Sequence, residues 1–131
     1  TIGKYTNIQD NTVIRGKDMV IGERVVIGHL VVCEAKKVSD CVLIGSGANV
    51  KEGAEIGEFS LIASGAIVPC NMNVQPMSLV VGIPARIRGK VPERHTATIE
   101  SLCESYIKKT KRYKKQGNLE SKEVCGLRAF D

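Results

Sequence analysis

Few side chains in this sequence combine a reactive group with a suggestive setting, and most of them lie in the first third of the chain. His29 is one of only two histidines. An imidazole changes charge near neutral pH, so it can serve as a general base or as a metal ligand. Gln9, Asp10 and Arg15 precede it, and Glu34 follows five residues later. Taken alone, His29 is interpreted as a surface imidazole, and the meaning of this group depends on the elements that position it.

Those elements are repeats. From Ile2 to Ala85 an aliphatic or similar residue returns at nearly every sixth position. Two spacings differ, a seven-residue step from Ile14 to Ile21 and a five-residue step from Cys33 to Val38. A short fixed period is typical of repeat architectures, and six residues is the period of a parallel β-helix. The repeated positions are Ile2, Ile8, Ile14, Ile21, Ile27, Cys33, Val38, Ile44, Val50, Ile56, Ile62, Val68, Val74 and Val80.

Each hexapeptide is expected to supply one short strand and one corner, so that three of them close a triangular coil. The aliphatic side chain points inward and stacks on its counterpart in the next coil, where β-branched residues fit well. Small residues that often follow are expected to ease corners with unusual backbone dihedral angles. A sandwich of antiparallel strands would instead show period-two alternation and hairpin turns. The sequence therefore predicts an all-β solenoid over residues 1–85. The small residues are Gly3, Gly22, Gly28, Gly45, Gly57 and Ala63.

After the repeats the periodicity becomes helical. A linker at 86–95, in which His95 is expected to be structural or solvated, leads to a predicted amphipathic helix at 96–117. Its apolar residues recur at i, i+3, i+4 and i+7, and this stripe is expected to pack on its own coil or in the groove between two coils. The tail at 118–131 is expected to be loose. The stripe consists of Ile99, Leu102, Cys103, Tyr106, Ile107, Thr110 and Tyr113.

The chain of 131 residues has the length of one domain and a net charge of +5. Six Lys or Arg crowd into the eight residues 108–115, which could meet anionic lipid or nucleic acid. Because no aromatic platform or groove-reading module accompanies them, a solvated helix face is the favoured interpretation, and no nucleic-acid partner is expected.

The five cysteines are odd in number, widely spaced and without a Cys-x-x-Cys pair. Free thiols in a reducing compartment are therefore predicted rather than a disulfide framework or a zinc ribbon. No apolar run reaches membrane-spanning length and no signal peptide is visible. We expect a cytoplasmic protein, or a mitochondrial one in a eukaryote. Thr1 falls inside a repeat, so we expect that earlier coils are missing, or alternatively that a partner covers the first coil. The cysteines are Cys33, Cys41, Cys70, Cys103 and Cys125.

Several stretches carry a family resemblance. They are the sequence Asn-Ile-Gln-Asp-Asn-Thr-Val-Ile at 7–14, Ile-Gly-His at 27–29, Ile-Gly-Ser-Gly-Ala at 44–48 and the exit at 78–86. With the five-residue step after Cys33, they resemble the gamma-class carbonic anhydrase family over residues 2 to about 116. The Gly-x-Pro-Ala exit is less specific, since hexapeptide acyltransferases share it. The resemblance implies a left-handed coil and a trimer.

The resemblance also implies a zinc site between two subunits, with three histidine ligands at the positions of Arg15, His29 and Glu34. Zinc held by three neutral imidazoles lowers the pKa of a bound water to about 7 and yields the hydroxide that attacks carbon dioxide. A guanidinium is always charged and has no electron pair to donate. We therefore predict a degenerate site, in which Arg15 and Glu34 form an ion pair and His29 of a neighbouring chain hydrogen-bonds to it. By the same resemblance, Gln9 and Asp10 orient water or substrate, although corner-forming polar residues explain them equally well.

These observations predict a non-catalytic trimeric scaffold or binding protein without a cofactor. A homotrimer is the default, a heterotrimer with related subunits is the alternative, and a small anion such as bicarbonate is a candidate ligand. Two other functions stay open. One is an active zinc enzyme of carbonic anhydrase or thioesterase-like type that uses His29 and Glu34. The other is an acyl-coenzyme A-dependent acyltransferase with His29 as its general base.

Overall fold

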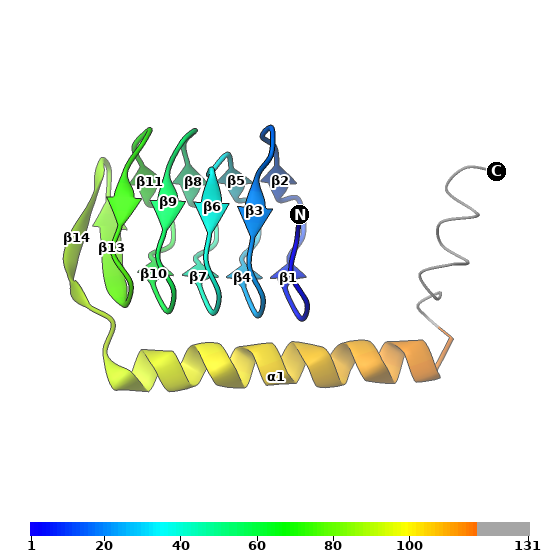
Figure 1. Cartoon of the computed structure of the whole chain (residues 1–131). Coiled ribbons are helices and arrows are strands. Elements are labelled where there is room, and N and C mark those ends of the chain that lie inside the picture. The colour runs from blue at the N-terminus through cyan, green and yellow to red at the C-terminus, as the bar shows by residue number, and fades with distance from the viewer. Residues whose placement is uncertain (118–131) are drawn as a thin grey trace.

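The computed structural model describes residues 1–117, which form a three-sided stack of short parallel strands with one long helix along its side (Figure 1). The first sheet contains β1 (Asn7–Ile8), β4 (Val26–Ile27), β7 (Leu43–Ile44), β10 (Leu61–Ile62), β13 (Ser78–Gly82) and β14 (Ala85–Lys90). The second contains β2 (Val13–Ile14), β5 (Val32–Cys33), β8 (Asn49–Val50) and β11 (Ile67–Val68). The third contains β3 (Val20–Ile21), β6 (Lys37–Val38), β9 (Glu55–Ile56) and β12 (Asn73–Val74). Successive strands alternate among the three sheets, which confirms the predicted solenoid.

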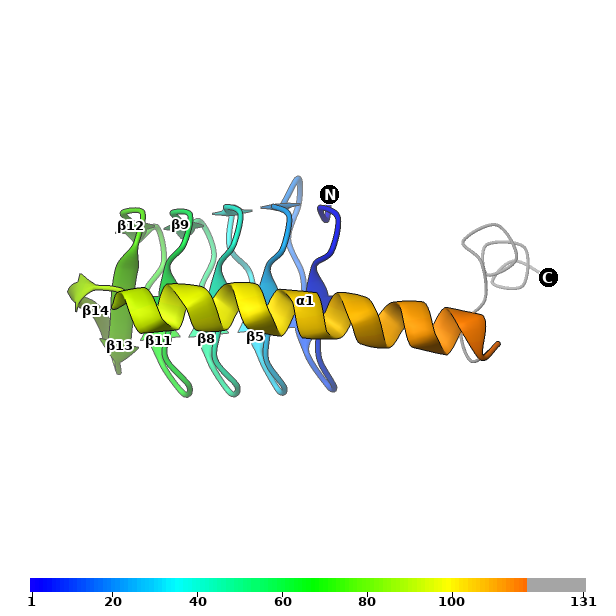
Figure 2. The same cartoon turned by 90° about the horizontal axis from the view of Figure 1, so that it is seen from below.

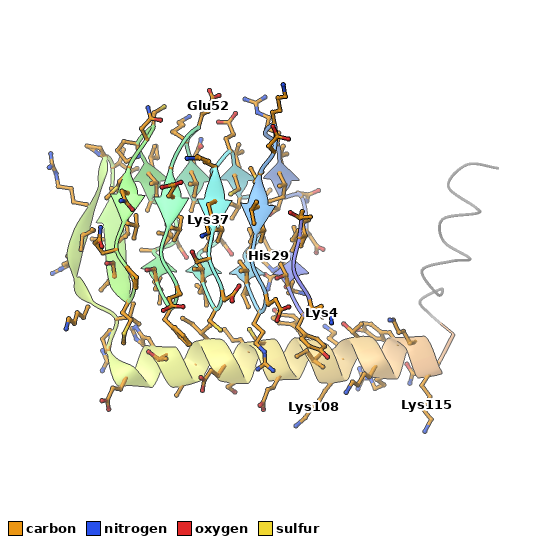
Figure 3. All side chains as sticks on the ribbon, in the orientation of Figure 1. Lys4, His29, Lys37, Glu52, Lys108 and Lys115 are labelled. Carbon is orange, nitrogen blue, oxygen red and sulfur yellow. The ribbon has the colours of Figure 1, made fainter. Side chains whose placement is uncertain are left out.

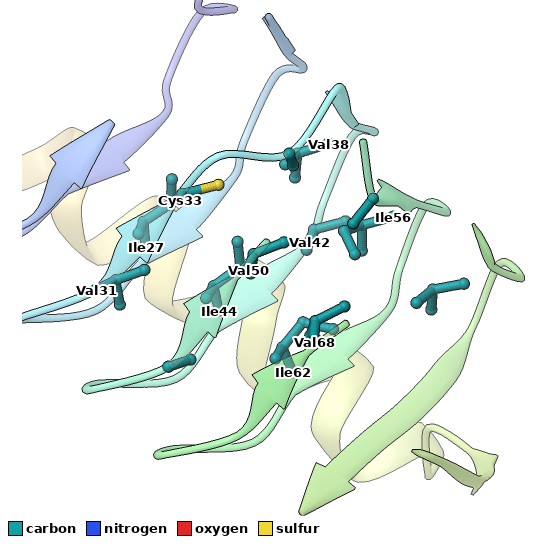
Figure 4. Packing of buried hydrophobic residues seen from close by; sticks show 14 of the residues in the cluster. Ile27, Val31, Cys33, Val38, Val42, Ile44, Val50, Ile56, Ile62 and Val68 are labelled. Carbon is teal, nitrogen blue, oxygen red and sulfur yellow. The ribbon is translucent and has the colours of Figure 1, made fainter. Parts of the chain in front are cut away.

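The core is a column of inward-pointing aliphatic side chains. In the first sheet the register pairs Ile27 with Ile44, Ile44 with Ile62, and Ile62 with Val80. All four side chains are fully buried, and Figure 4 shows Ile27, Ile44 and Ile62 stacked from coil to coil. Removing each one from water contributes about 1.5–3 kcal/mol. The hexapeptide period therefore fixes which side chains enter the core and which coil they touch.

The residues that adopt unusual backbone dihedral angles at the corners are not the predicted ones. Left-handed backbone conformations fall on non-glycine residues such as Tyr5, with a φ of 60°, and on other glycines, Gly47 and Gly65, both with a φ of 71°. Gly45 instead follows a strand, where a Cβ atom would collide with the backbone of Ser64 in the next coil. The expectation that the small residues supply unusual dihedral angles was therefore wrong. Gly45 is needed because adjacent coils approach closely, and its conformational freedom is not what the fold uses.

The exit from the stack is more ordered than predicted. β14 turns back to pair antiparallel with β13, so the residues 86–90 expected in a linker form a strand. This pairing covers the free edge of β13. Helix α1 (Glu93–Lys115) begins three residues before the predicted position, directly after Pro92, whose fixed φ of −61° suits a helix start. Because an apolar stripe marks only the packed face, it missed this polar first turn. The tail predicted at 118–131 lies outside the described residues.

Helix α1 lies along the outer face of the first sheet (Figure 2). Ile99 and Cys103 are each only 1% exposed and pack against Val26 of β4. The Cys103 thiol also donates a hydrogen bond to the backbone carbonyl of Arg24, with 3.1 Å between Sγ and O. The stripe thus packs on the side of its own coil stack, one of the two predicted locations. Within residues 1–117, no helix combines the length and the apolar character needed to cross a membrane.

The stacked core predicts that truncating a buried side chain lowers the free energy of unfolding far more than truncating an exposed one. Ile44→Ala is expected to lower the free energy of unfolding by about 2–5 kcal/mol, because a fully buried side chain leaves a cavity between two fixed coils. The matched control Ile87→Ala removes the same atoms from a side chain that is 44% exposed on β14, and should cost about 0.5 kcal/mol or less. Urea unfolding followed by circular dichroism measures both. Equal costs for the two variants would contradict the stacking model.

Candidate functional site

The first group of predicted site residues meets at the corner between the first and second sheets. Asp10 lies in the corner after β1, and His29 lies one coil later in the corner after β4. The distance from His29 Nδ1 to Asp10 Oδ2 is 3.9 Å, longer than a hydrogen bond. Both side chains are largely exposed to solvent. The carboxylate therefore lies near the imidazole without locking the ring. We call Gln9, Asp10 and His29 the histidine corner.

Helix α1 contributes to this corner. The side-chain amide of Gln9 donates a hydrogen bond to the Tyr106 hydroxyl, with 2.6 Å between Nε2 and O. Tyr106, Lys109 and Tyr113 line a groove of about 340 Å³ together with the histidine corner. Sequence reasoning missed this role, because it placed Tyr106 only in the apolar stripe. A hydroxyl group within an otherwise apolar stripe was the available signal.

The second group meets at the corner between the second and third sheets. Arg15 follows β2 and Glu34 follows β5, one coil apart. Arg15 Nε donates to Glu34 Oε1 at 2.5 Å, with side-chain exposures of 70% and 20%. Glu52 and Lys17 line the same groove, so its charges are nearly balanced. Glu52 lies on the far side of the stack from α1 (Figure 3). We call Arg15 and Glu34 the ion-pair corner.

The two corners lie at opposite ends of the strands of the second sheet, since His29 precedes β5 and Glu34 follows it. Within one chain, the histidine corner and the ion-pair corner therefore do not form one site. The predicted contact between the ion pair and His29 of a neighbouring chain stays a prediction, because the structure contains a single chain. The outward positions of the sheet between them are mostly apolar, namely Val13, Val32 and Ile67. Asn49 shares this row, and its buried Oδ1 has no hydrogen-bond partner among the described residues.

The residues at these corners do not fit the implied zinc ion. The Arg15 guanidinium has no lone pair to donate, and it already engages the Glu34 carboxylate. His29 supplies the only imidazole at either corner, whereas a catalytic zinc site needs three protein ligands. Within residues 1–117 of a single chain, no three His, Cys, Asp or Glu side chains are arranged to hold a metal ion. The second histidine, His95, lies in the first turn of α1, away from both corners.

The four cysteines within residues 1–117 take no part in either corner. Burial raises the pKa of the Cys33, Cys41 and Cys103 thiols. A raised pKa leaves less of the reactive thiolate at neutral pH. Cys70 is exposed, all four are free thiols, and Cys125 lies outside the described residues.

These thiols predict an order of alkylation. In a Cys125→Ser variant treated with iodoacetamide at pH 8, Cys70 should react first, and Cys33 and Cys103 much more slowly. Raising the pH should speed the slow pair, because more thiolate forms as the pH approaches their raised pKa. Peptide mass spectrometry after timed quenching measures each rate, and urea should make the rates equal. Native Cys103 reacting as fast as Cys70 would contradict the described burial.

The contact between Tyr106 and Gln9 predicts a second outcome. Tyr106→Phe should lower the free energy of unfolding by about 1 kcal/mol, because the Gln9 amide loses its partner while the ring stays packed. Tyr113→Phe is the control, since no hydrogen bond of the Tyr113 hydroxyl is seen within residues 1–117. Thermal unfolding of both variants measures the difference. Equal stability of the two would show that α1 is held to the first coil by apolar packing alone.

No family model matches the chain, but individual relatives do. A probable carbonic anhydrase from Methanocaldococcus jannaschii is 37% identical over 110 residues, which cover 82% of this chain and 69% of that protein. The mitochondrial gamma carbonic anhydrase 2 of Arabidopsis thaliana is 27% identical over 116 residues, covering 82% of this chain. The chain spans only 42% of the length of that plant relative.

Solved structures show the same fold. A hexapeptide transferase family protein from Anaplasma phagocytophilum has a TM-score of 0.80 and 31% identity, covering 86% of this chain and 68% of its own. A hexapeptide-repeat acetyltransferase from Vibrio cholerae, solved with acetyl coenzyme A, has a TM-score of 0.57 and 26% identity, covering 70% of this chain and 60% of its own. By its sequence and by its coil architecture, the chain belongs to the gamma-class carbonic anhydrase-like family of hexapeptide-repeat proteins, which fold as left-handed parallel β-helices.

Proposed function

We propose that this chain is a carbonic anhydrase-like subunit in which an ion pair replaces the zinc site, and that it acts as a non-catalytic trimeric scaffold or binding protein. One observation carries the proposal. The Arg15 guanidinium binds the Glu34 carboxylate at 2.5 Å, at the two positions where the family resemblance implies histidine ligands. The pair occupies both positions and satisfies both charges without a metal.

Electrostatics and ligand chemistry agree. Two unit charges about 4 Å apart near a protein surface interact by about 4 kcal/mol, so a divalent ion beside Arg15 would meet roughly twice that repulsion. Because Arg15 is 70% exposed, water screens part of this repulsion. The loss of two imidazole ligands is the larger obstacle. The guanidinium also carries N–H donors beyond the one that meets Glu34, and these suit a small anion such as bicarbonate.

The arrangement of the corners supports assembly. Each chain carries the histidine corner at one end of the strands of the second sheet and the ion-pair corner at the other end. The outward side chains Val13, Val32 and Ile67 lie between them. A head-to-tail ring would cover this apolar row and bring unlike corners together at every interface. Three copies give a homotrimer. In a heterotrimer, His29 of this chain could complete a metal site on a related subunit that keeps imidazoles at the positions of Arg15 and Glu34.

The free cysteines favour a reducing compartment. For that reason we propose the cytoplasm as the location of the protein, or the mitochondrion in a eukaryotic cell.

Metal content and native mass measured on the same preparation test the proposal. The wild-type protein is expected to be trimeric and to hold no stoichiometric zinc after dialysis against a zinc buffer. The double variant Arg15→His/Glu34→His should gain about one zinc ion per chain, because it restores three imidazoles at each interface. Adding His29→Ala to that variant is the control and should remove the gain. Stoichiometric zinc in the wild type, together with carbon dioxide hydration, would instead establish a metalloenzyme that uses His29 and Glu34.

One observation favours a second function. The Asp10 carboxylate lies 3.9 Å from His29 Nδ1, which is a suitable setting for a general base. The acetyltransferase from Vibrio cholerae described above shares the fold and was solved with acetyl coenzyme A. If this chain is an acyltransferase, calorimetry should detect acetyl coenzyme A binding by the wild type, and His29→Ala should abolish acyl transfer while leaving that binding intact. Absence of binding to the assembled protein would eliminate this alternative.

A further inference from the structure

The last turns of α1 carry a dense group of positive charges. Six of the eight residues at 108–115 are Lys or Arg, and no Asp or Glu occurs between Ser105 and Gly117. None of the six forms an ion pair with a carboxylate within residues 1–117. The earlier part of the helix, at 93–104, is acidic instead, with three glutamates and one arginine. The positive charge of α1 is therefore concentrated at one end.

Ordinary helix chemistry accounts for only part of this group. Cations at the end of a helix complement its macrodipole, but that effect is confined to the last turn, which holds Arg112, Lys114 and Lys115. Lys108 and Lys111 precede that turn. Like charges three or four residues apart repel each other, and Lys108 has two such neighbours, Lys111 and Arg112. This arrangement costs helix stability, and an anionic partner would remove that cost.

Four of these cations lie on the side of α1 that faces away from the coil stack. At about 100° per residue, they fall within about 70° of the direction opposite Ile99, Cys103 and Tyr106, which contact the stack. All four are exposed, and Figure 3 shows two of them pointing away from the stack. We call the four residues the basic face. Its members are Lys108, Lys111, Arg112 and Lys115.

The basic face is accessible to a flat partner. Helix α1 runs along one side of the stack, and among the described residues no other element lies beyond it on that side (Figure 1, Figure 2). The Arg112 guanidinium also lies over the Tyr113 ring, 5.6 Å from its centroid, which restricts the motion of this cation. A plane laid against α1 therefore meets the basic face without obstruction from the coils.

The composition of the basic face discriminates among polyanions. Single-stranded nucleic acid is bound on aromatic platforms, but the only aromatic residue at 107–115 is Tyr113, which is partly buried. A protein interface has an apolar core, whereas every member of the basic face is charged and the outward residue before it is Ser105. Anionic phospholipid requires neither feature, because clusters of Lys and Arg on a helix are attracted to it by charge.

We propose that the basic face attaches the protein to an anionic phospholipid surface, with α1 parallel to the surface and the coil stack behind it. Lipid headgroups then supply the anionic partners that the four cations lack within residues 1–117. Attachment is electrostatic and reversible, because no apolar side chain of the basic face enters the acyl chains. The sequence alone favoured a solvated helix face, and the unpaired charges with their shared outward direction support a binding face instead. The site is independent of both corners.

Sedimentation of the full chain with phospholipid vesicles tests the proposal. The protein is expected to bind vesicles that contain about one-third phosphatidylserine, but not vesicles of phosphatidylcholine alone. Binding should weaken as the salt concentration rises, since salt screens exposed charges. Hydrogen exchange at 107–115 should slow on the anionic vesicles, because the lipid relieves the repulsion between neighbouring cations. A helix face that is merely solvated would show none of these effects.

Two quadruple variants locate the site. Replacing all four members of the basic face by Gln, which preserves helix propensity, should weaken partitioning about 100-fold or more, since each basic residue near an anionic surface contributes roughly fivefold. The matched control removes the same charge from exposed positions on β6 and β14 and should weaken partitioning less than about fivefold. Circular dichroism verifies that both variants fold. The control substitutions are Lys37→Gln, Arg86→Gln, Arg88→Gln and Lys90→Gln.

Three results would overturn the proposal. Equal losses in the two quadruple variants would show that net charge, and not the basic face, drives attachment. Equal partitioning onto anionic and neutral vesicles, or onto neither, would show that anionic lipid is not recognised. Double-stranded DNA or polyglutamate that displaces the protein from vesicles at a lower anion concentration than the lipid would identify a nucleic acid or an acidic protein as the partner.

Discussion

The structure depends on the stacking of inward aliphatic side chains at the fixed spacing of parallel strands. Ile44 lies between Ile27 and Ile62 in one column, and the strands around them have only two residues each. Such short strands supply little pairing energy by themselves, so side-chain burial holds the coils in register. Register in turn places equivalent corners one above another. That is why Asp10 comes beside His29, and Arg15 beside Glu34, although each pair is separated by a whole coil.

The sequence predicted most where the period was strict and least where side chains act across elements. The inward positions followed from the spacing of Ile and Val, because successive side chains of a strand point to opposite faces of the sheet. The role of Gly45 was misjudged, since a close approach between coils leaves no periodic signal of its own. β14 was missed because Pro84 and the exposed Ile87 make its sequence resemble a connection. The ion pair of Arg15 and Glu34 was predicted from the family resemblance, which marked the two positions, together with the chemistry of a guanidinium. The hydrogen bond between Gln9 and Tyr106, in contrast, joins residues 97 apart that no local pattern relates.

The corners show how a site can change while its scaffold does not. Arg15 and Glu34 project from a corner into solvent-accessible space, and neither contributes to the aliphatic column. An exposed ion pair of this kind adds little to stability, so substitutions at these positions are nearly neutral for folding. The chemistry of a corner can therefore diverge freely among related chains with the same coils. This separation explains why acetyltransferases and carbonic anhydrases share one architecture, and why the fold alone does not identify the reaction.

The path of α1 has a consequence for biosynthesis. The helix starts beside β13 and β14 and runs back to β1, so Tyr106 must be synthesised before the side of β1 is covered. On the ribosome, the outer faces of Val26 and Leu43 emerge long before the helix that shields them. The nascent chain thus exposes an apolar sheet face until α1 has been synthesised, which is a period of risk for misassembly with other nascent chains. Folding from one end of the solenoid would not shorten that period, because only the arrival of α1 ends it.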